Sequence, residues 1–380
     1  MSLGNTVFFR ADAGVSIGMG HIRRCAVLAD EIAKCGAKVI LLTRRQPDVA
    51  ELDLLWPHDL CWMNGGPEVS FAGGLCGDEE ESDARQSLEA IQRLSGSRSW
   101  IVFDSGRLGY CWERIVRSAG HTVLVIEDSR VRKHCADIVV RDSQAPFDQT
   151  LISSNEACLQ LHGRLYALVD SRFSPSRERV CSPIRGGKIV LISYGGSDPT
   201  DETSKAIEAL VSLEASGSGD CQFGRIDIVV GPLNKRARAI VAAARKVRRA
   251  VIHHAPPCMA YLMREADICL TAGGNTLIEA LTMGKRCLVT MTADNQEATV
   301  YELSEEGAVV FLGRHTEVAP EHVAEAITEA LSDERKTMVA RTGSKAAYDH
   351  FGARRIVQEM SGYVHSNLNE DAPIGANRCR

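Results

Sequence analysis

Short apolar segments alternate with longer segments of helical periodicity along most of this chain of 380 residues. TVFFRA (6–11) and WIVFD (100–104) are typical of buried strands. The segment 21–35 places its apolar residues on one face of a helix. Strands that alternate with helices of ~10–15 residues predict βαβ units and therefore a parallel sheet.

The same alternation starts again at KIVLIS (188–193). We therefore predict an α/β protein of two Rossmann-like, doubly wound parallel-sheet domains. Such folds bind ligands outside the carboxyl ends of their strands, so two of them predict an interdomain cleft. The predicted bounds are an N-terminal domain over 1–170, a linker over 171–187, a C-terminal domain over 188–360 and a flexible tail over 361–380.

Composition excludes several classes of protein. A hydrophobic content of 44% and a charged content of 24% are ordinary globular values. The net charge of −5 does not favour a nucleic-acid partner. Since neither a signal peptide nor an apolar run of ~20 residues is evident, we expect a cytoplasmic protein without an integral membrane segment.

Cysteine usage indicates reduced thiols. The chain has 13 cysteines and no C-x-x-C pair, so neither a disulfide framework nor a zinc site is expected. Cys25, Cys35, Cys269 and Cys287 lie in or beside apolar segments, and we predict them to be core residues.

The first group of residues suited to chemistry follows the strand TVFFRA. Its glycines allow a tight turn and close approach of a ligand just before a helix begins. Arg23 stands where the dinucleotide fingerprint G-x-G-x-x-G has its third glycine. His21 lies at the helix N-terminus, where the helix dipole favours a neutral ring that can act as a base; a capping histidine is the alternative. The candidates are Arg10, Asp12, Gly18, Gly20, His21 and Arg24.

A second glycine turn, Tyr194-Gly195-Gly196-Ser197, follows the first strand of the second half. Backbone N–H groups of such a turn can hold phosphate oxygens. The alternative is a plain strand-to-helix turn in which Ser197 or Asp198 caps the helix. The sequence does not separate these interpretations.

The third group is the most specific. Gly273 and Gly274 precede a predicted helix, and exposed N–H groups at a helix start suit a diphosphate. Glu279 lies one helical turn beyond Asn275, where a carboxylate can accept both hydroxyls of a ribose. Polar residues after the next strand offer further hydrogen bonds to a sugar. The candidates are Gly273, Gly274, Asn275, Thr276, Glu279, Asp294, Asn295 and Gln296.

Together the patterns R-A-D-A, I-G-x-G-H-x-x-R, G-G-S-D-P, A-G-G-x-T-x-x-E and A-D-N-Q resemble the PseG and SpsG family. The second half is also similar to MurG-type UDP-GlcNAc transferases. The resemblance implies the GT-B fold. It also implies a hydrolase that cleaves the C1–O bond of UDP-2,4-diacetamido-2,4,6-trideoxy-β-L-altropyranose, or a close UDP-sugar, with inversion. Its products would be UDP and a free sugar for pseudaminic acid biosynthesis, and thus for flagellin glycosylation.

Site roles follow from the same resemblance. His21 would activate water, the segment 273–276 would hold the diphosphate, and Glu279 would hold the ribose. Asn295 and Gln296 would contact the sugar or its phosphates. The UDP-sugar is the expected partner. Because no D-x-D-like site is evident, we expect neither a cofactor nor a metal.

The sequence departs from the family pattern after the strand WIVFD. Where the family has Asp-His-Tyr-Gly-Leu, this chain has Asp-Ser-Gly-Arg-Leu (104–108). The change removes an imidazole and an aromatic ring from a loop that should face the cleft. It therefore bears on which sugar is bound more than on the UDP site.

Three other functions use the same residues. A GT-B glycosyltransferase would transfer the sugar to an acceptor, although the first half lacks an obvious basic and aromatic patch for a lipid carrier. An NADP-dependent oxidoreductase would use Gly18 and Gly20 for the pyrophosphate and Arg44-Arg45 for a 2′-phosphate. A non-catalytic nucleotide-sugar-binding protein would not need His21.

Overall fold

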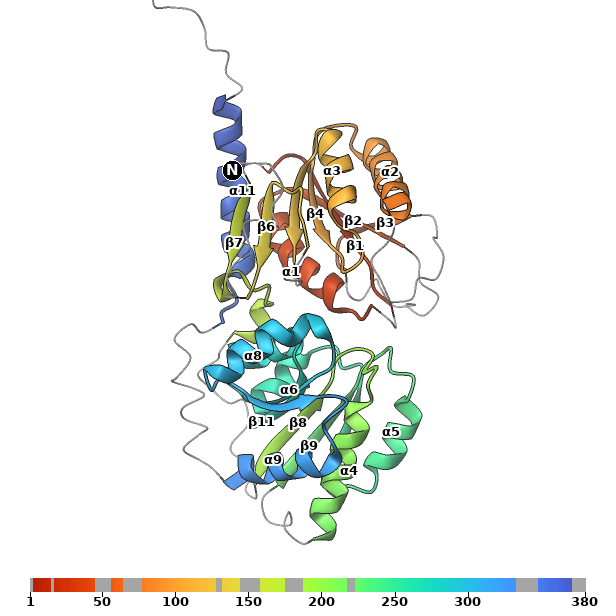
Figure 1. The fold of residues 1–380 in the computed structure, drawn as a ribbon, viewed down its shortest axis with the longest axis vertical. Helices are drawn as coiled ribbons and strands as arrows, with labels where there is room; N and C mark the ends of the chain where they lie inside the picture. Colours follow the sequence, from red (N-terminus) through yellow and green to blue (C-terminus); the bar gives the residue numbers. More distant parts are fainter. Residues whose placement is uncertain are drawn as a thin grey trace, which may run out of the picture.

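The computed structural model describes residues 3–14, 17–44, 56–63, 77–127, 132–143, 158–174, 187–216, 223–332 and 348–370. Two α/β domains lie one above the other, each built on a parallel sheet (Figure 1). The predicted architecture of two doubly wound parallel-sheet domains is confirmed.

Seven parallel strands form the N-terminal sheet in the order β3-β2-β1-β4-β5-β6-β7. Successive residues of β1 point to opposite faces, so Phe9 packs in the cluster that holds α1 and Phe8 in the cluster that holds α2 and α3. Burial on both faces explains the continuous apolar strands. The elements are β1 (Thr6–Ala11), α1 (Gly20–Lys34), β2 (Lys38–Arg44), β3 (Asp59–Met63), α2 (Gly77–Leu94), β4 (Trp100–Asp104), α3 (Tyr110–Ser118), β5 (Thr122–Ile126), β6 (Ile138–Arg141) and β7 (Leu159–His162).

Six parallel strands form the C-terminal sheet in the order β10-β9-β8-β11-β12-β13. Two short 3₁₀ turns, η3 (Arg164–Tyr166) and η4 (Ser171–Phe173), precede it. The elements are β8 (Lys188–Ser193), α4 (Glu202–Ala215), β9 (Phe223–Val230), α5 (Ala237–Ala244), β10 (Ala250–His254), α6 (Met259–Glu265), β11 (Ile268–Ala272), α7 (Asn275–Thr282), β12 (Arg286–Met291), η5 (Asp294–Gln296), α8 (Glu297–Glu305), β13 (Val310–Arg314) and α9 (Pro320–Ser332).

Strand order reverses at one place in each sheet. β1 has β2 on one side and β4 on the other, and β8 has β9 and β11 in the same way. In each sheet, the connections that follow the two neighbouring strands at this place run to opposite faces of the sheet. This divergence opens a crevice at the carboxyl ends of the strands. The polar and glycine-rich segments of the sequence follow these strands.

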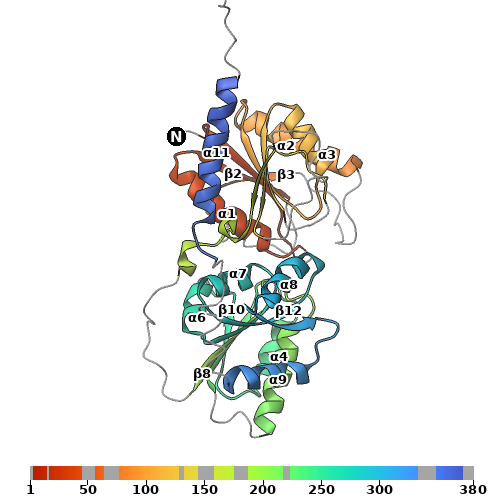
Figure 2. The same ribbon diagram turned by 60° about the vertical axis from the view of Figure 1, so that its left-hand side comes forward.

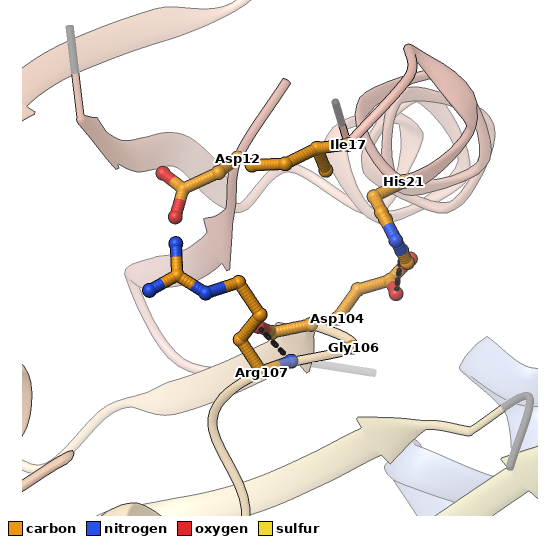
Figure 3. Close-up of a pocket in the computed structure, with 7 residues that line it drawn as sticks. Asp12, Ile17, His21, Asp104, Gly106 and Arg107 are labelled. Carbon is orange, nitrogen blue, oxygen red and sulfur yellow. Dashed lines mark hydrogen bonds and ion pairs between the residues drawn. The ribbon is translucent and has the colours of Figure 1, made fainter. Parts of the chain in front are cut away.

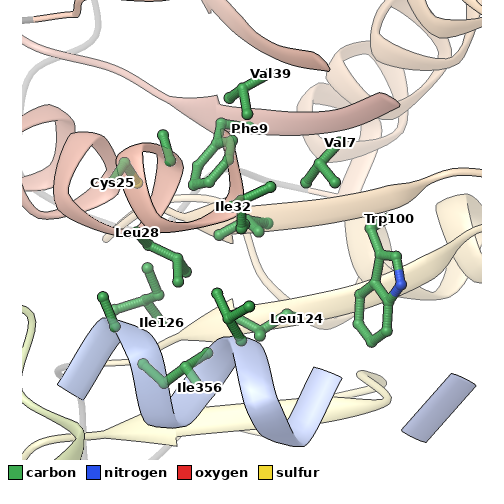
Figure 4. Packing of buried hydrophobic residues seen from close by; sticks show 14 of the residues in the cluster. Val7, Phe9, Cys25, Leu28, Ile32, Val39, Trp100, Leu124, Ile126 and Ile356 are labelled. Atoms are coloured by element: carbon green, nitrogen blue, oxygen red, sulfur yellow. The ribbon is translucent and has the colours of Figure 1, made fainter. Parts of the chain in front are cut away.

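The last described helix, α11 (Gly352–Glu370), returns to the N-terminal domain. Ile356, Val357 and Met360 share a buried cluster with α1, beside which α11 runs (Figures 2 and 4). A Cβ on Gly352 would overlap the carbonyl group of Ala167. The backbone at Gly352, where the chain crosses between the domains, therefore packs directly against the backbone at Ala167.

This helix corrects the predicted domain bounds. Residues 352–360 pack on the N-terminal domain rather than the C-terminal one, and 361–370 are helical rather than a flexible tail. Apolar residues at helical spacing form the helix, but spacing alone does not indicate which domain it covers. Residues 371–380 of the tail and 175–186 of the predicted linker lie outside the described residues.

Two other expectations concern buried and membrane-spanning segments. Cys25, Cys269 and Cys287 are buried as predicted, whereas Cys35 is exposed because it directly follows the last turn of α1. Within the part of the chain that the structure describes, no helix has the length and apolarity needed to span a bilayer.

Candidate active site

Two glycine backbones fix the turn between β1 and α1. Gly18 donates its N–H to the carbonyl of Gly14 at 2.6 Å, and Gly14 donates to the carbonyl of Gly18 at 3.1 Å. Gly18 has a φ of +78°, which would strain a residue that carries a Cβ. The turn makes Gly20 the first residue of α1 and His21 the second.

His21 and Arg24 share the carboxylate of Asp104, the last residue of β4. The Nδ1 atom of His21 lies 2.6 Å from Oδ1 of Asp104, and Arg24 donates to both carboxylate oxygens at 2.5 Å. Burial alone would raise the pKa of Asp104, but the charges of Arg24 and His21 outweigh it and hold that pKa well below its usual range. Because an ionised carboxylate only accepts hydrogen bonds, Nδ1 of His21 is the donor, and in the neutral ring Nε2 carries the lone pair. A histidine in this tautomer can act as a general base.

A pocket opens at the carboxyl ends of β1 and β4 (Figure 3). His21 and Asp104 lie at one side of it, and the side chains of Asp12 and Arg107 face each other at the other. Of the residues predicted from sequence, Asp12 and His21 line this pocket. Its lining residues are Asp12, Ile17, His21, Asp104, Ser105, Gly106 and Arg107.

Sequence reasoning did not assign a role to Asp104 or Arg107. The available signal was the departure from the family pattern over 104–108, at the end of the strand next to β1. Because β4 pairs with β1, the segment 104–108 lies at the same edge of the sheet as Asp12.

Arg10 lies behind the pocket, which corrects its predicted contact with substrate. Its side chain is 1% exposed, and it forms ion pairs of 2.7 Å with both Asp12 and Asp83. Asp83 in turn pairs with Arg44, whose backbone N–H donates to Asp12 at 2.9 Å. Arg10 therefore orients Asp12 and does not itself line the pocket.

The C-terminal part of the site is formed by backbone at the start of α7. Gly274 is the N-cap residue, and no side chain caps this helix end. A Cβ on Gly274 would meet no atom within 4 Å, whereas a Cβ on Gly273 would overlap Val300. Gly273 is therefore required for packing, and Gly274 leaves open space at an uncapped helix N-terminus, next to Asn275 and Thr276. Such an end favours an anion.

The start of α1 brings the three predicted groups together across the domain contact. Asn275 Nδ2 donates to the carbonyl of Gly20 at 3.1 Å. Glu279 lies on α7 within the electrostatic reach of Arg23, which partly opposes the burial that raises the pKa of Glu279 to about 7. A Cβ on Gly196 would lie 2.9 Å from the sulfur of Met19, so the second glycine turn also approaches this helix end.

The second glycine turn leads from β8 into α4. Asp198 caps α4 by accepting the N–H groups of Glu202 and Thr203 at 2.9 and 3.0 Å, which supports the strand-to-helix interpretation. Tyr194 is buried in the core cluster of the C-terminal domain, which corrects its predicted contact with substrate. Gly195, with a φ of +84°, and the half-buried Ser197 remain on the turn itself.

The segment 294–296 forms the short turn η5 after β12. The Oε1 atom of Gln296 accepts the N–H groups of Gly273 and Thr292 at 3.2 and 2.9 Å, so this side chain joins two strand ends. Asp294 is 91% exposed and pairs with Arg314, and Asn295 is exposed. The contact of Gln296 with a sugar stays a prediction.

Among the described residues, no group of three or more His, Cys, Asp or Glu side chains is arranged to hold a metal ion. The charged side chains that line the pocket are Asp12, Asp104 and Arg107.

Comparison with known proteins gives the fold and distant sequence relatives. No family model matches the chain. It is 24% identical to the protein MJ1062 of Methanocaldococcus jannaschii over 282 residues, 72% of this chain and 53% of that one. It is 26% identical to the spore coat polysaccharide biosynthesis protein SpsG of Bacillus subtilis over 167 residues, 44% of this chain and 48% of that one. The matches thus span about half the length of these relatives.

Solved structures with the same arrangement cover nearly the whole chain. MurG of Acinetobacter baumannii superposes with a TM-score of 0.65 at 17% identity, over 94% of this chain and all of that one. The S. aureus MnaA–UDP co-structure gives 0.65 at 13% identity over 98% and 100%, and the calicheamicin glycosyltransferase CalG4 gives 0.61 at 12% over 97% and 99%. The chain has the GT-B fold.

Proposed function

We propose that this protein hydrolyses a UDP-sugar at the C1–O bond with inversion, releasing UDP and a free sugar. One observation carries the proposal. The start of α7, which suits a diphosphate, lies against the start of α1, which presents His21, with Asn275 and Gly20 joined by a hydrogen bond of 3.1 Å. A leaving diphosphate on α7 would thus place the anomeric carbon beside the base.

The C-terminal domain binds UDP in this proposal. The diphosphate lies at Gly274, Asn275 and Thr276, where the uncapped helix end stabilises the charge that develops on the leaving group. The carboxylate of Glu279 accepts the ribose hydroxyls. A helix end supplies this stabilisation without a metal ion, so turnover in the presence of EDTA is part of the proposal.

His21 activates water in this proposal. Nε2 of His21 takes a proton from water as the water oxygen bonds to C1, and the C1–O bond to UDP breaks with its electron pair leaving on UDP. Asp104 holds the imidazole and stabilises the imidazolium that forms, while Arg24 keeps Asp104 ionised. Attack from the face opposite UDP inverts the anomeric centre.

The names of similar proteins support the class of substrate. SpsG is named for spore coat polysaccharide biosynthesis, and MnaA was solved with UDP. The motif resemblance favours UDP-2,4-diacetamido-2,4,6-trideoxy-β-L-altropyranose or a close UDP-sugar, and hence a role in pseudaminic acid biosynthesis. Transfer to an acceptor is the second candidate, because MurG and the glycosyltransferase CalG4 share the fold.

A turnover assay without acceptor separates hydrolysis from transfer. Purified protein is incubated with that UDP-sugar and with UDP-GlcNAc in the presence of EDTA, and UDP is followed by phosphorus NMR. Hydrolysis predicts release of UDP together with an equal amount of free sugar. Binding of both compounds without release of UDP would move the function to transfer.

A further inference from the structure

Arg107 is the arginine that lines the pocket, and the proposed mechanism does not use its charge. It lies three residues beyond β4 in the loop that departs from the family pattern, and its side chain extends along the pocket toward Asp12 (Figure 3). Its Nε atom is buried and, among the described residues, has no hydrogen-bond partner. A buried guanidinium N–H without an acceptor is costly, so the site lacks a group that this arginine can bind.

The neighbouring acids do not supply that group. Asp12 faces Arg107, but its oxygens accept Arg10 at 2.7 and 2.9 Å and the backbone N–H of Arg44 at 2.9 Å. Glu79 attracts Arg107 electrostatically, yet it is exposed to solvent on α2. Burial lowers the pKa of Arg107 despite both acids, as expected for a cation whose charge is incompletely balanced.

The position of Arg107 indicates which part of a ligand would reach it. His21 and Arg107 lie on opposite sides of the pocket, so a sugar with C1 at His21 directs a substituent from the far side of its ring toward Arg107. A planar guanidinium binds a carboxylate through two parallel hydrogen bonds, one of which can come from Nε. Ser105 and Gly106 are small and leave room for such a group.

We infer that Arg107 binds a carboxylate on the sugar, so that the substrate is a UDP-linked acidic sugar. This inference rests on the proposed function but departs from the sugar favoured there, because the trideoxy diacetamido sugar has a methyl group and no carboxylate. A sugar with a methyl group at this position would leave the buried N–H of Arg107 without an acceptor.

Paired ligands test the inference by isothermal titration calorimetry. UDP-glucuronate is compared with UDP-glucose, and UDP-N-acetylglucosaminuronate with UDP-GlcNAc, each pair differing only at C6, which is a carboxylate in the first and a hydroxymethyl group in the second. We expect at least one acidic ligand to bind about tenfold more tightly than its neutral partner, the effect of a charge-assisted bidentate contact. Arg107→Gln should abolish that preference without changing the affinity for UDP. Arg85→Gln is the matched control, because Arg85 is 70% exposed on α2 and lies outside the pocket.

The outcomes separate the two proposals. Equal affinity within each pair, or a preference that survives in Arg107→Gln, overturns the inference while leaving UDP binding intact. A loss of preference in Arg85→Gln as well would assign it to net charge and overturn the inference too. Failure of UDP itself to bind would instead overturn the proposed function.

Discussion

The two halves of the site are formed by different chemical groups. At the N-terminal pocket, charged side chains hold one another: Asp104 is held by His21 and Arg24, and Asp12 by Arg10. At the C-terminal half, Gly274 and the uncapped start of α7 offer backbone and open space. The first arrangement positions groups that move a proton, and the second accepts a charge that arrives with the ligand. Substitutions in the two halves should therefore fail in different ways.

The sharpest contrast is expected for His21→Ala. Loss of a general base should lower kcat by about 10²–10⁴-fold while the UDP affinity stays within about twofold, because His21 belongs to the N-terminal half. His254→Ala is the control, since His254 is exposed at the end of β10. If His21→Ala lost both turnover and UDP binding, His21 would be structural and the contrast between the two halves would be removed.

The N-terminal half should also lose stability at alkaline pH. His134 is buried between Glu113 and Glu127 at 2.9 and 3.0 Å; burial opposes its charge, but these two carboxylates raise its pKa to about 9. Its stabilising contribution, about 3 kcal/mol, is therefore complete below pH 6.5 and is lost as the pH rises through 9.

Denaturant unfolding at pH 6.5, 8 and 9.5 measures this effect. His134→Gln should flatten the fall in free energy of unfolding over this range. Through Glu127, His134 also connects to Arg132, which donates to the carbonyls of Ser105 and Leu108. An unchanged slope in the variant would assign the pH dependence to other groups.

Two adjacent glycines sharpen the description of the C-terminal half. Gly274→Ala adds a methyl group to open space where the diphosphate is proposed, so UDP affinity should fall about tenfold with little change in stability. Gly273→Ala forces a methyl group against Val300 and should cost about 1–3 kcal/mol of stability. Thermal unfolding and titration with UDP distinguish them. If Gly274→Ala bound UDP normally, the diphosphate would lie elsewhere.

The smallest effect is expected at Glu279. Burial raises its pKa to about 7, so the carboxylate that accepts ribose hydroxyls forms only as the pH rises through neutrality. UDP affinity should rise about fivefold between pH 6 and 8 beyond the rise caused by titration of UDP itself. The variant Glu279→Gln measures the rise caused by titration of UDP alone. Identical pH profiles for the two proteins would remove the ribose assignment.

Periodicity was sufficient to predict the two sheets and to place the polar groups at strand ends. It could not reveal the partner of His21, because Asp104 lies 83 residues away and becomes its neighbour only through the pairing of β1 with β4. Nor could it show that Arg10 is buried or that α11 covers the N-terminal domain. Each depends on strand order or packing, which spacing within one segment does not encode.

Glycine patterns had the same limit. Gly273 and Gly274 are adjacent residues of the same type. A side chain on Gly273 would overlap Val300, whereas Gly274 faces open space. Only the three-dimensional neighbours distinguish a packing glycine from one that a ligand can approach.

The origin of the oxygen atom gained by the sugar tests the central claim most directly. The protein is incubated in H₂¹⁸O, without acceptor, with the diacetamido UDP-sugar and with the acidic UDP-sugars, and the products are analysed by proton NMR and mass spectrometry. Hydrolysis at C1 with inversion predicts ¹⁸O in the sugar and none in UDP, with the opposite anomer formed first. Incorporation of ¹⁸O into UDP, or first formation of the retained anomer, would contradict a water molecule activated by His21 that attacks C1 opposite the bound diphosphate.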